Sequence, residues 1–269
     1  MKGLSRASLA EVEERFNAVA GSADLGTLAD ELFAIADLLD REHGLRRSLS
    51  DPARPAGQKA QVVQVLLEGK VSVAALETAV AAVSAKWTRG GDLADALERL
   101  GVVAAAAEAE AQSRLDDVED ELFRFGRIAA SNLDLSRALT NPASPEAAKR
   151  ELLVSLLTGK VAPTTLRLVT QVVLHPRGRS LENGLTDFGQ LVAAQRQRLV
   201  AVVRSAIALS EVQKQRLAAW LRTSYGRDVH LNVEVDPQVI GGFSVRIGDD
   251  LIDTTIAGRI EEVRRRLAG

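Results

Sequence analysis

Apolar residues in the first two thirds of the chain recur three and four positions apart. Residues at this spacing share one face of a helix, which predicts amphipathic helices packed on a core. Three runs show the spacing: Leu28, Leu32, Ile35, Ala36 and Leu39; Val73, Leu76, Val80, Val83 and Trp87; and Leu115, Val118, Leu122, Phe125 and Ala129. The Ala- and Glu-rich stretch from Val102 to about Ser131 predicts one long helix, because these residue types favour helix.

The helical pattern repeats at an offset of 90 residues. Between Asp30 and Leu76, 17 of 47 positions are identical to those 90 residues later. The residues in step include Asp30–Phe33 with Asp120–Phe123, Pro52 with Pro142, Pro55 with Pro145, Lys59 with Lys149, and Leu66–Val71 with Leu156–Val161. Shared Ala and Leu content would produce scattered matches, but it would not align prolines, glycines and lysines. We therefore interpret the repeat as an internal duplication.

Prolines and glycines predict where the repeated helices begin and end. Asp51–Pro55 and Asn141–Pro145 each end one helix and start the next, because proline fits the first helical turn and breaks a helix interior. Gly69 and Gly159 follow Leu-Leu-x at the position of a helix C-cap. Each copy is thus predicted to be a bundle of several helices.

From about Leu199 the pattern changes to alternation, most clearly in Val229–Val235, which predicts strands. Ser210 is a predicted N-cap for a helix with Leu217, Trp220 and Leu221 on one face. Further signals follow in order: Gly226 as the end of that helix, Asp236–Pro237 as a turn, Gly248–Asp250 as a hairpin turn, and a closing helix with Ile256, Ile260, Val263 and Leu267 on its apolar face.

Together these patterns predict a mainly α fold. Two tandem helical bundles related by internal duplication precede a small α/β C-terminal module. The predicted domains are residues 1–101, 102–198 and 199–269.

Composition narrows the possible functions. With 46% hydrophobic residues the chain can bury a core, and its net charge of -2 gives no general attraction to nucleic acid. The chain has no cysteine, which excludes disulfides and cysteine nucleophiles. The apolar stretches Val71–Ala85 and Gly101–Ala107 carry a glutamate or are too short to span a membrane. Acidic residues interrupt Met1–Ala20, which therefore lacks the apolar core of a signal peptide. We expect a soluble protein whose membrane association would come through a partner.

Candidate catalytic motifs are incomplete. Gly69–Lys70 and Gly159–Lys160 lack the upstream glycine and the following Ser or Thr of a phosphate-binding loop, so helix C-caps explain them better. His43, His175 and His230 are far apart, with no acidic residue at metal-ligand spacing.

Two charged clusters near the C-terminus also have simpler explanations. Asp249, Asp250 and Asp253 could pair for acid/base chemistry, but turn formation explains the first two. Arg264–Arg266 suits the last turn of a helix, where the helix dipole favours cations. We predict no catalytic, cofactor-binding or metal-binding residue. What remains is apolar helical surface, which either packs internally or offers a groove to a partner helix.

The stretch Val235–Ile260 closely resembles the C-terminal motif of the delta subunit family of F-type ATP synthases, which includes the oligomycin-sensitivity-conferring protein. The motif residues singled out, as structural ones, are Asp236, Pro237, Gly241, Gly242, Gly248, Asp249, Asp253 and Arg259. Ser136–Pro142 and Leu156–Val161 also look like the family, in the right order. Gly241 and Gly242 permit close backbone approach and Gly248 permits a turn.

The resemblance implies a non-catalytic peripheral-stalk subunit without a cofactor. In the family, a helical bundle binds the N-terminal helix of an alpha subunit of the catalytic head, and the C-terminal part meets the b-type stalk. By resemblance the chain would hold the head against rotor torque, peripherally at the cytoplasmic face of the bacterial plasma membrane. It would bind no nucleic acid and insert nothing into the membrane. The stalk could lie along the face that carries Arg259 and Arg264–Arg266.

The duplication departs from the usual family member, which has one bundle. It implies an actinobacterial type, some of which are fused to a membrane-anchored b-like segment, so we expect a free form or a trimmed one. In one hypothesis the first bundle, about Ser5–Gly101, sits on the head and the second extends the stalk. The reverse is the alternative, because the second copy adjoins the C-terminal module. A general helical adaptor would fit the bundles but not the motif, and an enzyme would need a polar pocket that nothing predicts.

Overall fold

A computed structural model describes residues 3–196, 199–207, 209–225, 229–236, 239, 242–247 and 250–253. The chain divides into two compact units, Met1–Gln195 and Arg196–Gly269. The first is helical and the second is built on a small sheet, which confirms the predicted fold class.

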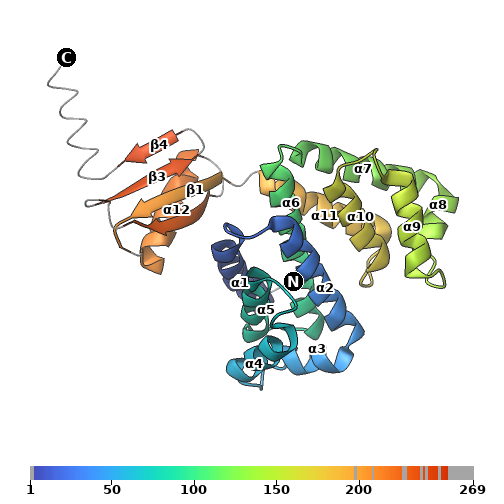
Figure 1. Cartoon of the computed structure of the whole chain (residues 1–269), viewed down its shortest axis with the longest axis horizontal. Coiled ribbons are helices and arrows are strands. Elements are labelled where there is room, and N and C mark those ends of the chain that lie inside the picture. The colour runs from blue at the N-terminus through green and yellow to red at the C-terminus, as the bar shows by residue number, and fades with distance from the viewer. Residues whose placement is uncertain are drawn as a thin grey trace, which may run out of the picture. The chain divides into compact units, whose positions relative to one another are not determined.

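The first unit contains the two copies of the repeat (Figure 1). Its helices are α1 (Leu4–Ala20), α2 (Leu25–Arg41), α3 (His43–Ser50), α4 (Ala56–Leu67), α5 (Val73–Ser84), α6 (Gly90–Ala111), α7 (Leu115–Ser131), α8 (Leu133–Thr140), α9 (Glu146–Leu157), α10 (Pro163–Leu174) and α11 (Leu181–Arg196). Helices α2 to α5 begin and end 90 positions before α7 to α10. The duplication predicted from sequence is thereby confirmed.

The loops of the two copies repeat as well. Gly69 and Gly159 follow α4 and α9 with φ of 71° and 74°, a left-handed conformation that glycine adopts without strain, so both are helix ends as predicted. The carboxylate of Glu31 accepts a hydrogen bond from the backbone N of Ser72 (2.8 Å), at the start of α5. Glu121, 90 positions later, accepts one from the backbone N of Ala162 (2.8 Å), at the start of α10. Each glutamate thereby satisfies a free N–H at a helix N-terminus.

The predicted single helix from Val102 to about Ser131 is wrong. Helix α6 ends at Ala111 and α7 begins at Leu115. Between them Ser113 adopts a φ of 57°, and the backbone N of Arg114 donates to the carbonyl of Ala109 (2.8 Å). Such a left-handed residue closes a helix end even when it is not a glycine. Because no proline or glycine marks the break, composition alone suggested continuity.

Helix α6 belongs to both copies. It packs against α1, α2, α3 and α5 on one side and against α7 and α10 on the other, and one continuous apolar core runs through it. Residues 90 positions after α1 are 94–110, which lie within α6. An ion pair joins Arg15 of α1 to Glu77 of α5, and another joins Glu108 of α6 to Arg167 of α10. Glu77 and Arg167 are 90 positions apart, so an acid in the first copy is replaced by a base in the second, while their partners Arg15 and Glu108 are 93 positions apart. The predicted boundary at 101/102 falls inside this helix.

The second unit places one helix on a four-stranded sheet. Its elements are β1 (Leu199–Ser205), α12 (Glu211–Tyr225), β2 (Val229–Val235), β3 (Phe243–Ile247) and β4 (Asp250–Asp253). The strand order is β2-β1-β3-β4, with β1 parallel to β2 and the other pairs antiparallel. The buried side chains of its core are Ala201, Val203, Leu217, Leu221, Val245 and Ile247.

Where the structure describes the second unit, it can be compared with the helix signals predicted from the sequence. The backbone N of Gln213 donates to the Ser210 hydroxyl, so Ser210 caps α12. Leu217 and Leu221 face the core, whereas Trp220 is half exposed. The predicted helix end at Gly226 and the predicted closing helix lie outside the described residues. The predicted domain boundary, between residues 198 and 199, lies three residues after the division between the two compact units at 195/196.

Candidate functional site

The family-motif residues that are described gather at one end of the sheet. Asp236 follows β2, and its backbone N donates to the carbonyl of Ser205, the last residue of β1 (2.9 Å). Gly242, with a φ of 84°, precedes β3. Asp253 ends β4 and is paired with Ser244 of β3. The other motif residues lie outside the described part of the chain: Pro237, Gly241, Gly248, Asp249 and Arg259.

The sequence candidates for chemistry belong to different elements. His43 is exposed at the start of α3, while Nε2 of His175 lies 3.1 Å from Oδ2 of Asp37. His230 lies in β2 and Asp250 in β4, and Arg264–Arg266 is outside the described residues. Across the described residues, no group of three His, Asp or Glu side chains could hold a metal ion. No helix of the described chain is long and apolar enough to cross a membrane.

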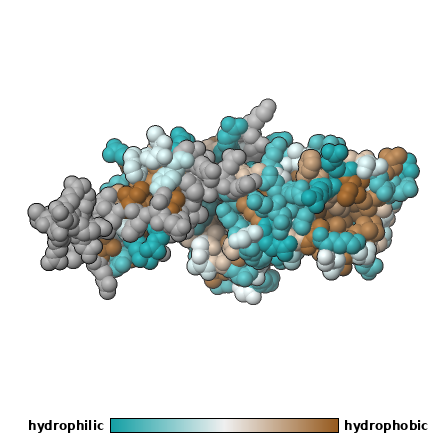
Figure 2. All heavy atoms as spheres, turned by 90° about the horizontal axis from the view of Figure 1, so that it is seen from above, coloured by the Kyte–Doolittle hydropathy of each residue, from teal (hydrophilic) through white to brown (hydrophobic). Residues whose placement is uncertain are grey.

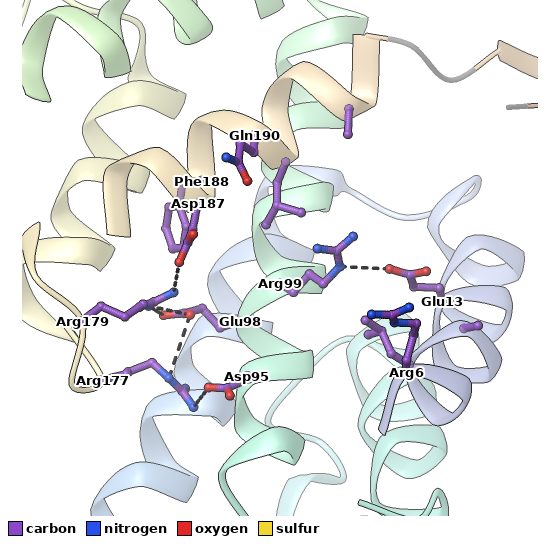
Figure 3. A pocket seen from close by; sticks show the side chains of 14 residues that line it. Arg6, Glu13, Asp95, Glu98, Arg99, Arg177, Arg179, Asp187, Phe188 and Gln190 are labelled. Carbon is purple, nitrogen blue, oxygen red and sulfur yellow. Dashed lines mark hydrogen bonds and ion pairs between the residues drawn. The ribbon is translucent and has the colours of Figure 1, made fainter. Parts of the chain in front are cut away.

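The helical unit has a charged cleft of about 750 Å³ where the two copies meet (Figure 3). It is lined by α1, α6, α11 and the loop before α11. In Figure 3 two arginines of that loop reach toward acids on α6. Nη2 of Arg177 lies 2.9 Å from Oδ1 of Asp95, and Nη2 of Arg179 lies 2.8 and 2.7 Å from the two carboxylate oxygens of Glu98.

The backbone of this loop aims both arginines at the first copy. Arg177 and Gly178 have φ of 52° and 75°, and the backbone N of Arg179 donates to the carbonyl of Pro176 (2.9 Å). This left-handed turn follows α10. The Arg177 side chain is only 6% exposed and also lies 3.0 Å from Asp40 of α2. Non-glycine residues adopt positive φ at a cost, so the contacts of Arg177 hold the turn in place.

Burial dominates the electrostatics of the cleft, because it disfavours the charged form of an acid. Burial raises the pKa of Glu98 to about 7, although Arg179 and Arg177 both act to lower it. Outside the cleft, burial likewise raises the pKa of Asp37 on α2, against the lowering effects of His175 and of a hydrogen bond from Gln171. Removing one partner of such a network leaves a buried charge unpaired, which costs about 3–5 kcal/mol. The network therefore fastens the copies together.

A second set of contacts fastens α10 along its length. Nε of Arg167 lies 2.8 Å from Oδ1 of Asp30 on α2, and Arg167 also pairs with Glu108 on α6. Nε2 of Gln171 donates to Oδ1 of Asp37 (3.1 Å). Sequence reasoning missed these residues. The available signal was the change of charge between aligned positions, since Arg167 stands where the first copy has Glu77.

Apolar side chains remain exposed on the helical unit. In the second copy these are Phe123, Ile128, Leu133, Val154 and Leu156. Figure 2 shows hydrophobic residues gathered over the part of the molecule that contains α7, α8 and α9. An exposed cluster of this kind marks a surface for a protein partner more often than a place for catalysis.

Comparison with known proteins is consistent with a binding role. The family model described as ATP synthase delta (OSCP) subunit matches residues 101–267. Three proteins named ATP synthase subunit delta are similar over their whole length. The one from Thermobifida fusca is 52% identical over 100% of both chains, and that from Streptomyces coelicolor is 50% identical over 100% of this chain and 98% of its own. The protein from Streptomyces griseus is 48% identical over 100% of both. This chain therefore belongs to the ATP synthase delta (OSCP) subunit family.

Proposed function

We propose that the chain is a non-catalytic peripheral-stalk subunit of an F-type ATP synthase. It joins the catalytic head to the b-type stalk and resists rotor torque during proton-driven ATP synthesis. Its partners are the N-terminal helix of an alpha subunit and the end of the b-type subunit, at the cytoplasmic face of the bacterial plasma membrane. Membership of the delta family supports this role.

The observation that carries the proposal is the rigid joint between the two copies. A linker between head and stalk must not yield when the rotor turns, and a flexible connection would absorb the rotation. Here the copies share α6 and one apolar core, and Arg177 and Arg179 fasten the second copy to acids of the first. Continuous packing and buried ion pairs give the stiffness that the role demands.

Binding to the head is the first test. Purified chain is sedimented with catalytic head particles that have been stripped of their own delta subunit. We expect a one-to-one complex that is lost when the N-terminal segment of the alpha subunit is removed. A folded chain that stays in the supernatant would contradict the proposal. Chains shortened by either copy then show which bundle binds the head.

Torque transmission is the second test. The double variant Arg177→Ala, Arg179→Ala loosens the joint between the copies. In reconstituted membranes we expect it to bind the head but to reduce proton-driven ATP synthesis, with ATP hydrolysis by soluble heads unchanged. The control is Arg114→Ala, which removes an exposed ion pair with Asp117 in the same unit. Equal rates of proton-driven ATP synthesis with the double variant and with Arg114→Ala would show that the contacts of Arg177 and Arg179 do not transmit torque.

A further inference from the structure

The loop of residues 175–179, which follows α10, carries three basic side chains that all contact acids of the first copy. The pairs are His175 with Asp37 (3.1 Å), Arg177 with Asp40 and Asp95 (3.0 and 2.9 Å), and Arg179 with Glu98 (2.7 Å). The acids lie on α2 and on α6. This short loop therefore holds the second copy on two helices of the first.

The joint, and not the local sequence, imposes the left-handed backbone of this loop. From residue 89 on, the copies align at an offset of 88 positions, which pairs Arg89–Gly90 with Arg177–Gly178 and Gly101 with Gly189. Arg89 has a φ of -127°, and its 72% exposed side chain pairs with Asp92 of the helix that it precedes. Arg177 has a φ of 52°, and its side chain is 6% exposed. Release of Arg177 from the first copy would relieve this strain.

The hydrogen bonding of Arg177 is also incomplete. Its Nε and Nη1 atoms are buried and make no hydrogen bond. Nη1 lies 3.0 Å from Oδ2 of Asp40 and Nε lies 3.9 Å from Oε2 of Glu98, so charge attraction holds them without hydrogen-bond geometry. A buried donor without an acceptor is costly, and water would satisfy both donors if the loop lifted. The docked loop is therefore poised to open.

Two of the acids that the loop contacts are almost completely buried. Glu98 is 3% exposed and Asp37 is 8% exposed. Burial raises the pKa of Glu98 to about 7 and also raises the pKa of Asp37. If the loop lifts, water reaches both carboxyls and their pKa values fall toward the ordinary range. Opening therefore releases protons, so a rise in pH favours it.

The other charged groups around the two acids do not reverse this direction. Arg179 and Arg177 lower the pKa of Glu98 and Asp95 raises it, while His175, Arg177 and Arg41 lower that of Asp37. Further charged groups nearby are Asp187 of α11, which lies 3.9 Å from Arg179, and Arg6, Glu13 and Arg99, which line the cleft from α1 and α6. Because burial outweighs the nearby arginines at both acids, both favour opening at high pH.

We propose that the 175–179 loop is a pH-sensitive latch, which lifts from α2 and α6 as the pH rises and widens the cleft between the copies. Acid pH keeps the latch docked. The copies stay connected, since they share α6 and one apolar core, so lifting moves α11 away from α1 without unfolding the chain. In a stalk subunit, this latch makes the stiffness of the joint depend on the pH of the surrounding solution.

Distances between spin labels on the full chain test the proposal. Because the chain has no cysteine, labels attach only where one is introduced. One label is placed at Ala10→Cys on α1 and the other at Gln190→Cys on α11, two exposed positions that line the cleft (Figure 3). Electron–electron double resonance measures their separation in samples prepared at pH 5, 6, 7 and 8. The control pair, Ala10→Cys with Val65→Cys, lies within the first copy, where Val65 is 76% exposed on α4.

We expect a second, longer distance between α1 and α11 whose population, relative to the docked one, rises by about tenfold or more from pH 5 to pH 8. The control pair should keep one distance. Adding Glu98→Gln and Asp37→Asn should abolish the rise, because neither replacement titrates. Glu108→Gln removes an acid of the same joint that pairs with Arg167 and is 23% exposed, and it should leave the pH dependence in place.

The proposal is overturned if the distance between α1 and α11 is the same at every pH, or if the longer distance grows on acidification. It is also overturned if the rise survives in the double variant, or if Glu108→Gln abolishes it as completely. Circular dichroism establishes that each variant is folded. If the double variant does not fold, Glu98→Gln and Asp37→Asn are measured singly, and each must reduce the rise. A chain that sediments with the head but shows one distance at every pH would refute the latch and leave the stator proposal intact.

Discussion

Glu98 is buried against Arg179, and burial raises the pKa of its carboxyl from 4.5 to about 7. An acid with a higher pKa in the fold than in the unfolded chain binds more protons when folded. Its contribution to stability is therefore fully present below about pH 4.5 and is lost as the pH rises through 7. Relative to Glu98→Gln, which keeps the shape but does not titrate, the wild type should lose up to about 3 kcal/mol over this range.

Urea unfolding of both proteins at several pH values between 4 and 8 measures this difference. Charged groups that face Glu98 include Arg177, Arg179 and Asp95, and they are present in both proteins, so their own effects largely cancel. Glu77→Gln, which removes the acid of an ion pair with Arg15 on α1, controls for the substitution itself. Parallel stability curves for the wild type and Glu98→Gln would show that the carboxyl of Glu98 has the same pKa in the folded and the unfolded chain.

Gly101 and Gly189 are equivalent residues with opposite surroundings. A methyl group at Gly101 would lie 2.7 Å from Cε1 of Phe33, whereas at Gly189 it would meet no described atom within 4 Å. Gly101→Ala should therefore lower the free energy of unfolding by about 1–3 kcal/mol through overpacking. Gly189→Ala should raise it by about 0.5–1 kcal/mol, because alanine favours helix. Urea denaturation compares the two, and equal effects would contradict the difference in packing.

Individual elements could be predicted where a local signal marks them. Gly69 and Gly159 marked helix ends because only the left-handed backbone fits there, and Ser210 marked a helix start because its hydroxyl satisfies a free N–H. The end of α6 had no such signal. Ser113 takes the left-handed conformation at a cost in strain, so tertiary packing of α7 sets the position of the break rather than local preference.

The strain at Ser113 leads to a prediction for the α6–α7 connection. Ser113→Gly should stabilise the chain by about 1 kcal/mol, because glycine adopts a positive φ without steric cost. Ser144→Gly, in a turn without positive φ, should instead lower stability slightly through chain entropy. Thermal unfolding followed by circular dichroism measures both. If both glycines lower the melting temperature, the conformation at Ser113 is not strained.

At the scale of the whole molecule, the sequence predicted the repeat but not how the copies join. The duplication was visible because Pro52, Pro55 and Gly69 recur in step. Arg177 pairs with Asp95 of α6 and Arg167 pairs with Asp30 of α2, so the partners of both arginines lie far away in sequence. The shared use of α6 was also hidden, since a helix that serves two bundles has no distinct local pattern. Most of the motif at the C-terminus was predicted by resemblance and remains an expectation.

Shared use of α6 predicts that the two copies unfold together. Trp87, in the first copy, is 4% exposed, and with Trp220→Phe it becomes the only tryptophan. Leu153→Ala opens a cavity in the second copy, where Leu153 is fully buried, and should cost about 2–5 kcal/mol. If the continuous core makes the helical unit cooperative, this distant cavity must lower the urea midpoint reported by Trp87 fluorescence as much as the midpoint reported by circular dichroism. Val63→Ala, the equivalent change in the first copy, should shift both signals too. If Leu153→Ala leaves the Trp87 midpoint unchanged, the two copies unfold independently of each other. A joint between independently unfolding copies could not transmit torque.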